Sequence, residues 1–142
     1  GEWLAQEELQ RRLVHEYVHV VARSIASDNM PWWVNEGLAE TLSKSFSEYD
    51  IARLSDVYAA GGGYSLAHLE SNRVEAFSPK DLKLAYLQSH ATVDLLWSRL
   101  GQSRMMRFLR ALSNGMNGEA ALQAAYQRTY ADLERQVAAA YR

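Results

Sequence analysis

The chain has 142 residues, of which 48% are hydrophobic, and its 15 basic and 17 acidic side chains give a net charge of −2. This length and composition are typical of one soluble globular domain with a substantial core, and the balanced charge favours neither nucleic acid nor an anionic membrane as a partner. No cysteine is present, which excludes disulfides, thiolate metal sites and cysteine nucleophiles. No apolar run approaches the roughly 20 residues of a membrane-spanning helix. Glycine in place of an initial methionine suggests a trimmed chain or the remnant of a tag, in which case upstream residues could be missing, and a targeting signal with them.

The N-terminal third is predicted to form two helices. Residues 3–26 form the first, polar at its start and apolar almost all round from residue 13 to residue 22, so that it enters the interior midway. A turn is expected at residues 27–29, and Pro31 suits the first turn of a second helix that reaches about Phe46. Gly37 lies inside this helix at a cost of about 1 kcal/mol relative to alanine, which indicates that another backbone passes close by.

The pattern becomes irregular after the second helix. From residue 47 to residue 77, with glycines at 61–63, we expect a mobile loop with at most short elements. Clear helix signals then return, with Ser78 as an N-cap and Thr129 opening a capping box. The helices predicted in this part cover residues 78–101, 103–113, 119–127 and 129–142.

The first helix carries HEYVH, residues 15–19, in its apolar stretch. A separation of four residues places His15 and His19 on one helix face, where two imidazoles can hold one metal ion. Zinc is the natural candidate for such ligands, and catalytic zinc sites use three protein ligands and a water, whose proton Glu16 could take as general base. The competing interpretation is a pair of hydrogen-bonded core histidines with Glu16 at the surface.

The second helix offers the third ligand, Glu36, in the stretch NEGLAE. If the two helices pack antiparallel, Glu36 returns beside the histidines. Glu40, one turn further on, can then accept a hydrogen bond from the imidazole nitrogen that does not bind the metal. The alternative for both glutamates is an exposed acidic face, which fits poorly with the apolar residues around them.

Together these motifs resemble the gluzincin group of zinc metallopeptidases, and most closely the bacterial peptidase MA-like proteins. The matching pieces extend over nearly the whole chain, and they are residues 15–19, 33–40, 85–89 and the C-terminal run from residue 99. The resemblance implies that His15, His19 and Glu36 bind one zinc ion and that Glu16 is the general base.

The resemblance also suggests a donor for the oxyanion of the tetrahedral intermediate. Tyr86 falls where related gluzincins place a stabilising hydroxyl, and His90, one turn along the same face, is the competing candidate. A third interpretation places Tyr86 in a core aromatic stripe with Val93 and Trp97. His68 is expected at the surface.

The implied fold is the helical lobe of a zincin-like α+β metallopeptidase domain. The β-sheet usual in zincins precedes the metal helix, and nothing ahead of Trp3 could supply it, so we expect a mainly α chain. Residues 1–142 would form a single domain with a zinc-binding helix pair (1–47), a loop region (48–77) and C-terminal helices (78–142).

The implied function is hydrolysis of a peptide or protein substrate by a zinc-activated water. The alternatives are a non-catalytic, zinc-stabilised helical module that binds a partner, and an all-helical scaffold without metal. Substrate specificity, oligomeric state and location, whether cell envelope or cytoplasm, stay open at this point.

Overall fold

The computed structural model describes residues 2–26 and 29–142, and the side chains of residues 5–24 and 29–142. The described residues form seven α-helices, one short 3-10 helix and no strand, which confirms the predicted mainly helical fold. The predicted turn at Ser27 and Asp28 lies outside the described residues. The elements in chain order are α1 (Glu2–Ala26), α2 (Trp32–Ser43), α3 (Glu48–Ala59), η1 (Asn72–Ala76), α4 (Pro79–Leu100), α5 (Gln102–Ser113), α6 (Gly118–Tyr126) and α7 (Tyr130–Tyr141).

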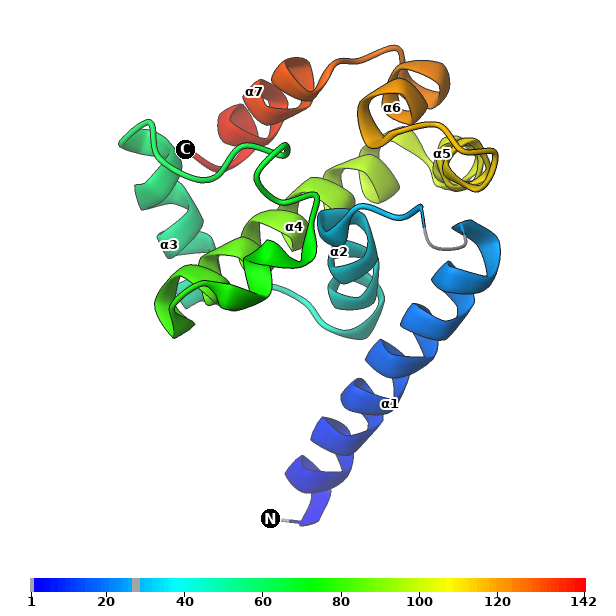
Figure 1. Cartoon of the computed structure of the whole chain (residues 1–142). Coiled ribbons are helices and arrows are strands. Elements are labelled where there is room, and N and C mark those ends of the chain that lie inside the picture. The colour runs from blue at the N-terminus through cyan, green and yellow to red at the C-terminus, as the bar shows by residue number, and fades with distance from the viewer. Residues whose placement is uncertain (1, 27–28) are drawn as a thin grey trace.

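The long helix α4 runs through the middle of the molecule (Figure 1). α2 packs along it, α1 packs against α2 and α5, and α5 pairs with α6 at one end. α3 and α7 pack together at the other end, while the N-terminal half of α1 projects away from the body (Figure 1). No helix in the described part of the chain combines the length and the apolar character needed to cross a membrane.

The contact between α2 and α4 is unusually close at Gly37. A Cβ on this residue would lie 2.3 Å from Cγ2 of Val93 and 2.5 Å from the carbonyl oxygen of Ser89. The prediction that another backbone passes close to Gly37 is therefore confirmed, and that backbone is α4. Since Glu36 directly precedes Gly37, the same contact sets the depth at which the Glu36 carboxylate lies.

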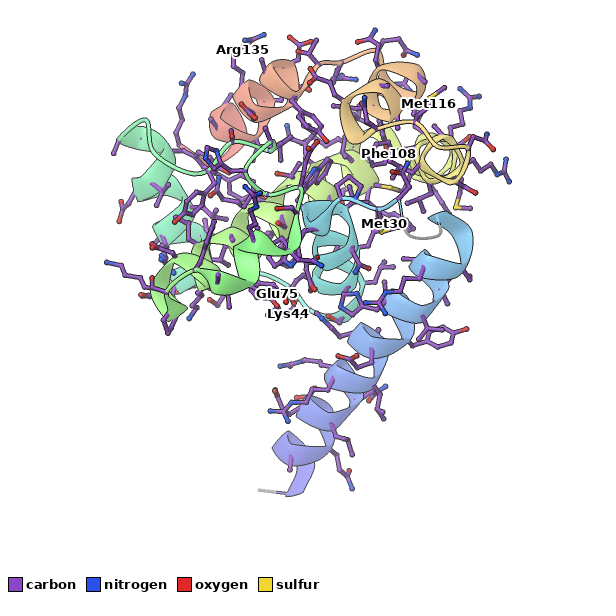
Figure 2. All side chains as sticks on the ribbon, in the orientation of Figure 1. Met30, Lys44, Glu75, Phe108, Met116 and Arg135 are labelled. Carbon is purple, nitrogen blue, oxygen red and sulfur yellow. The ribbon has the colours of Figure 1, made fainter. Side chains whose placement is uncertain are left out.

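An aromatic core holds the N-terminal end of α2. The ring of Trp33, which is fully buried, lies 6.0 Å from the rings of both Phe108 and Tyr130. Phe108, labelled in Figure 2, also contacts Tyr126 with 6.0 Å between ring centres. The Trp33 indole N–H donates a 3.4 Å hydrogen bond to the Tyr130 hydroxyl. α2 is thus anchored by α5 and α7, both of them far away in sequence, and Tyr126 of α6 supports Phe108 from behind.

The prediction of a loop with at most short elements from residue 47 to residue 77 is wrong in its first part. α3 is as long as α2, and it begins with a capping box in which Ser47 and Asp50 each accept a 3.1 Å hydrogen bond from the other's backbone N–H. Leu54 is its one buried residue, so the helix shows little hydrophobic periodicity in the sequence. Its stability comes from the cap and from packing against α7, which the local pattern does not reveal.

Three other helix boundaries can be compared with the sequence. The predicted caps at Ser78 and Thr129 are confirmed, because each hydroxyl accepts a hydrogen bond from the backbone N–H three residues later. α2 ends at Ser43, short of the predicted end near Phe46. The Phe46 ring instead stacks on His90 of α4, with 3.8 Å between ring centres.

Candidate metal centre

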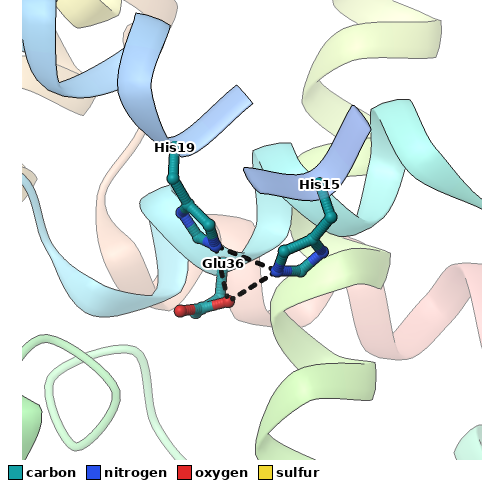
Figure 3. Close-up of side chains that lie close together, drawn as sticks. All are labelled: His15, His19 and Glu36. Atoms are coloured by element: carbon teal, nitrogen blue, oxygen red, sulfur yellow. Dashed lines mark hydrogen bonds and ion pairs between the residues drawn. The ribbon is translucent and has the colours of Figure 1, made fainter. Parts of the chain in front are cut away.

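Side chains from α1 and α2 converge in the arrangement that the sequence predicts (Figure 3). The Nε2 atoms of His15 and His19 lie 2.9 Å apart, and they lie 3.6 and 3.4 Å from Oε2 of Glu36. A tetrahedral zinc ion with bonds of about 2.0–2.1 Å separates its ligand atoms by about 3.3 Å. The spacing of these three atoms therefore fits a single metal ion.

The Glu36 carboxylate supplies a second argument for a cation. Its Oε2 atom is buried and has no hydrogen-bond partner among the described residues. A buried carboxylate oxygen left without a partner is costly, and a metal ion at the meeting point of the three side chains would satisfy it. The chemistry of the donors, two imidazoles and one carboxylate, is that of zinc sites.

The charges in the cluster are strongly coupled. The carboxylates of Glu36 and Glu40 raise the pKa of His15 to about 9, and Glu36 also raises the pKa of His19. Although burial opposes the shift, the two histidines lower the pKa of Glu36 to about 2. In the absence of a metal, the His15 imidazole therefore carries positive charge at neutral pH beside the carboxylates, and a metal ion would take the place of its bound proton.

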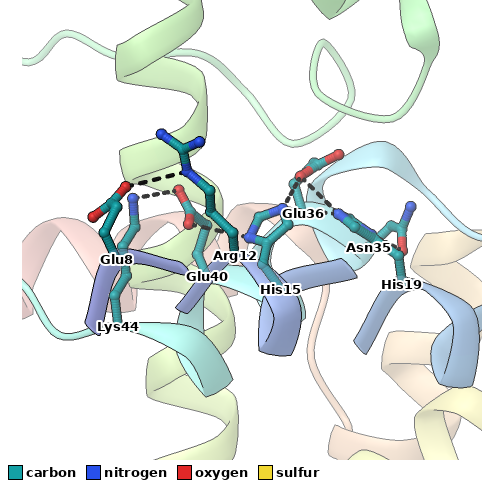
Figure 4. Close-up of polar contacts among 8 residues, drawn as sticks. All are labelled: Glu8, Arg12, His15, His19, Asn35, Glu36, Glu40 and Lys44. Carbon is teal, nitrogen blue, oxygen red and sulfur yellow. Dashed lines mark hydrogen bonds and ion pairs between the residues drawn. The ribbon is translucent and has the colours of Figure 1, made fainter. Parts of the chain in front are cut away.

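The second nitrogen of each imidazole faces an oxygen from α2 (Figure 4). Nδ1 of His19 donates to Oδ1 of Asn35 at 2.9 Å, which leaves the lone pair on Nε2. Nδ1 of His15 lies 3.6 Å from Oε2 of Glu40. The other carboxylate oxygen of this buried glutamate forms an ion pair with Nζ of Lys44 at 3.0 Å. Such contacts orient metal-binding imidazoles.

The sequence predicts Glu40 beside the histidines but does not mark Asn35 as a site residue. An asparagine has no marked position in the motif, and its place directly before Glu36 is the sole sequence signal. Its contact with His19 depends on how α1 and α2 are rotated about their axes relative to each other. That rotation cannot be predicted from the sequence of either helix alone.

A groove of about 860 Å³ opens beside the cluster. His15 and Glu16 line it from α1, Glu40 from α2 and Tyr86 from α4. Glu16 is exposed, whereas its neighbour His15 is half-buried. The structure thus places the predicted general base in a solvent-accessible groove next to one of the predicted metal ligands.

The two candidate oxyanion donors occupy different environments. Tyr86 lines the groove while its ring packs against Trp32 at 5.1 Å, so it combines a groove position with partial core packing. Burial and the neighbouring carboxylates raise the pKa of Tyr86 to about 12, so its hydroxyl remains a proton donor at neutral pH. His90 is 3% exposed, stacks on Phe46 and is not among the residues that line the groove, and burial lowers its pKa.

His68, the remaining histidine, lies apart from the centre. It is exposed, as predicted, and its Nδ1 atom shares a 2.9 Å hydrogen bond with Ser65. This separation makes His68 a useful control for the experiments described below.

Comparison with known proteins agrees with this geometry. A family model described as the Peptidase MA superfamily matches residues 6–141, a range that contains every residue of the centre and of the groove. No curated protein and no solved structure shows a significant match to the chain.

Proposed function

The chain belongs to the Peptidase MA superfamily, and from this premise we propose that it is a zinc-dependent metallopeptidase. The observation that carries the proposal is the convergence of His15, His19 and Glu36, with their three ligand atoms 2.9–3.6 Å apart beside an open groove. The buried Oε2 atom of Glu36 forms no hydrogen bond among the described residues and lies 3.4 and 3.6 Å from the two Nε2 atoms, a spacing that a shared metal ion would bridge.

In this proposal His15, His19 and Glu36 hold one zinc ion. When bound, zinc would polarise the substrate carbonyl and lower the pKa of a water towards about 7. Glu16 would take a proton from the attacking water and pass it to the leaving amine, for which its exposed position in the groove is suited. The Tyr86 hydroxyl would donate a hydrogen bond to the oxyanion that forms from the peptide carbonyl.

One observation favours the non-catalytic alternative, a zinc-stabilised helical module that docks a partner. Four large apolar side chains of α1 are between 57% and 69% exposed: Leu9, Leu13, Tyr17 and Val20. Their spacing of three or four residues places them on one face of the helix. Such a stripe is typical of a helix face that packs against another surface.

Metal analysis combined with a cleavage assay separates the two functions. We expect one zinc ion per chain in the unmodified protein and in His68→Ala, and its loss in His15→Ala and Glu36→Gln. Glu16→Gln should retain zinc but lose about 10²–10⁴-fold in peptide cleavage, because it removes the proton acceptor.

Absence of zinc from the unmodified protein at neutral pH would refute both functions. If zinc is retained but neither the unmodified protein nor Glu16→Gln cleaves any member of a peptide library, the module is favoured over the peptidase.

A further inference from the structure

The groove that contains Glu16 and Tyr86 extends away from the metal centre between two helical walls. α1 supplies one wall and α4 the other, and the end of α2 contributes to the lining. On both helices the lining continues one to two helical turns towards the N-terminus, starting from His15 on α1 and from Tyr86 on α4. The side chains that matter here are Glu8, Arg11 and Arg12 of α1, and Leu82 and Lys83 of α4.

This far end of the groove has an excess of positive charge. Three of its lining residues are cations, and Glu8 is the acidic residue among them. Both arginines share the Glu8 carboxylate, which lies 3.3 Å from Nε of Arg12 (Figure 4) and 4.0 Å from a guanidinium nitrogen of Arg11. Arg11 also lies 3.8 Å from Glu7, which is not part of the lining. The charges of both arginines are thus already partly balanced.

Lys83 is different, because it forms no ion pair with any described carboxylate. Its ammonium group lies 5.5 Å from the centre of the exposed Tyr49 ring of α3, a contact that leaves the charge uncompensated. Leu82, the neighbouring residue of the wall, is half-buried and offers aliphatic surface. The two residues together match a side chain that has methylene groups and a terminal carboxylate.

The position of Lys83 relates it to the bond that would be cleaved. It precedes Tyr86 by three residues, which corresponds to about 4.5 Å along the helix axis. An extended peptide advances about 3.3 Å per residue. If the substrate runs along α4 with its carbonyl at Tyr86, the side chain of the first or second residue from the cleaved bond lies beside Lys83.

We propose that Lys83 makes the groove selective for peptides with an acidic side chain, glutamate above all, one or two residues from the cleaved bond. This inference rests on the proposed peptidase function. Lys83 acts in it as a specificity residue, since it is the groove cation whose charge a substrate would neutralise.

The test uses matched peptides that carry Glu, Gln or Lys at each position near the cleaved bond. Cleavage is measured as kcat/KM with the zinc-loaded protein, and binding by fluorescence anisotropy with zinc-loaded Glu16→Gln. Because the ion pair would be partly exposed, we expect a preference of about threefold to fivefold for Glu over Gln. The preference should vanish in Lys83→Ala, turn towards the Lys peptides in Lys83→Glu, and weaken in about 0.5 M salt.

Lys80→Glu is the matched control. Lys80 lies on the same helix and is exposed, but it is not among the residues that line the groove, so this variant should keep the preference.

Several results would overturn the inference. They are equal binding and cleavage of Glu and Gln peptides by the unmodified protein, a preference that persists in Lys83→Glu, and no peptide binding at all.

The inference and the peptidase function can fail separately. Selective binding of Glu peptides without cleavage would support the inference and contradict the peptidase function. Cleavage of the peptides without any charge preference would support the peptidase function and contradict the inference about Lys83.

Discussion

Replacing Gly37 with alanine should destabilise the fold and weaken the metal centre together. The new Cβ would lie 2.3 Å from Cγ2 of Val93 and 2.5 Å from the carbonyl oxygen of Ser89, whereas optimal contacts between carbon atoms are about 3.5–4.0 Å. The Val93 side chain can rotate, but the Ser89 oxygen belongs to the backbone of α4. The two helices must therefore separate by about 1 Å.

The expected magnitude combines two opposing effects. Overpacking a filled core costs about 1–3 kcal/mol, and a clash with backbone belongs at the upper end of that range. Alanine is a better helix former than glycine by about 1 kcal/mol, which offsets part of this cost. We therefore expect a net loss of about 2 kcal/mol in the free energy of unfolding.

Urea denaturation followed by circular dichroism measures this loss, with a chelator present so that bound metal does not contribute. Gly62→Ala is the control: its Cβ would meet Val57 at 3.3 Å or more, and we expect a change below about 0.5 kcal/mol. Val93→Ala should partly rescue Gly37→Ala, because it removes the shortest contact, and a double-mutant cycle would show this coupling.

Zinc affinity, measured by competition with a chelator, gives a second readout for Gly37→Ala. Displacement of α2 moves Glu36 away from the histidines of α1, so affinity should fall along with stability. The reasoning is refuted if Gly37→Ala stabilises the protein by about 1 kcal/mol, the result expected for a glycine in an uncrowded helix.

Three further predictions concern the centre and α3. Asn35→Ala removes the acceptor for Nδ1 of His19 and should lower zinc affinity about 10–100-fold in a chelator competition, while an unchanged affinity would show that the contact does not orient the imidazole. In the metal-free protein, the raised pKa of His15 contributes stability that is fully present below pH 6.5 and lost as the pH rises through about 9. The lowered pKa of Glu36 contributes stability present above pH 4.5 and lost as the pH falls towards about 2. Tm of the metal-free protein should therefore be highest between these limits and fall on both sides, and a Tm that keeps rising from pH 7 to pH 9 would contradict the coupling. Ser47→Ala removes the capping box of α3 and should cost about 1 kcal/mol in urea unfolding, whereas a cost near zero would mean that packing against α7 alone holds the helix.

Features that depend on local backbone geometry can be predicted from the amino-acid sequence alone. Since the helical period is set by hydrogen bonds between near neighbours, four residues between His15 and His19 suffice to place both on one face. The caps at Ser78 and Thr129 are local in the same sense, and Gly37 marks a close approach because of what it lacks.

How those helix faces meet depends on tertiary packing. The rotation and spacing of helices depend on side chains far apart in the chain, such as Trp33 and Tyr130, which together fix α2. For that reason the contact of Asn35 with His19 could not be predicted, and neither could the choice of Tyr86 over His90 as the residue that lines the groove. α3 was not predicted because Leu54 is its one buried residue, which leaves almost no hydrophobic period, although the capping box at Ser47 is a local signal of the same kind as the one at Thr129. The groove that Lys83 lines exists because α1 and α4, more than 50 residues apart in sequence, both pack against α2.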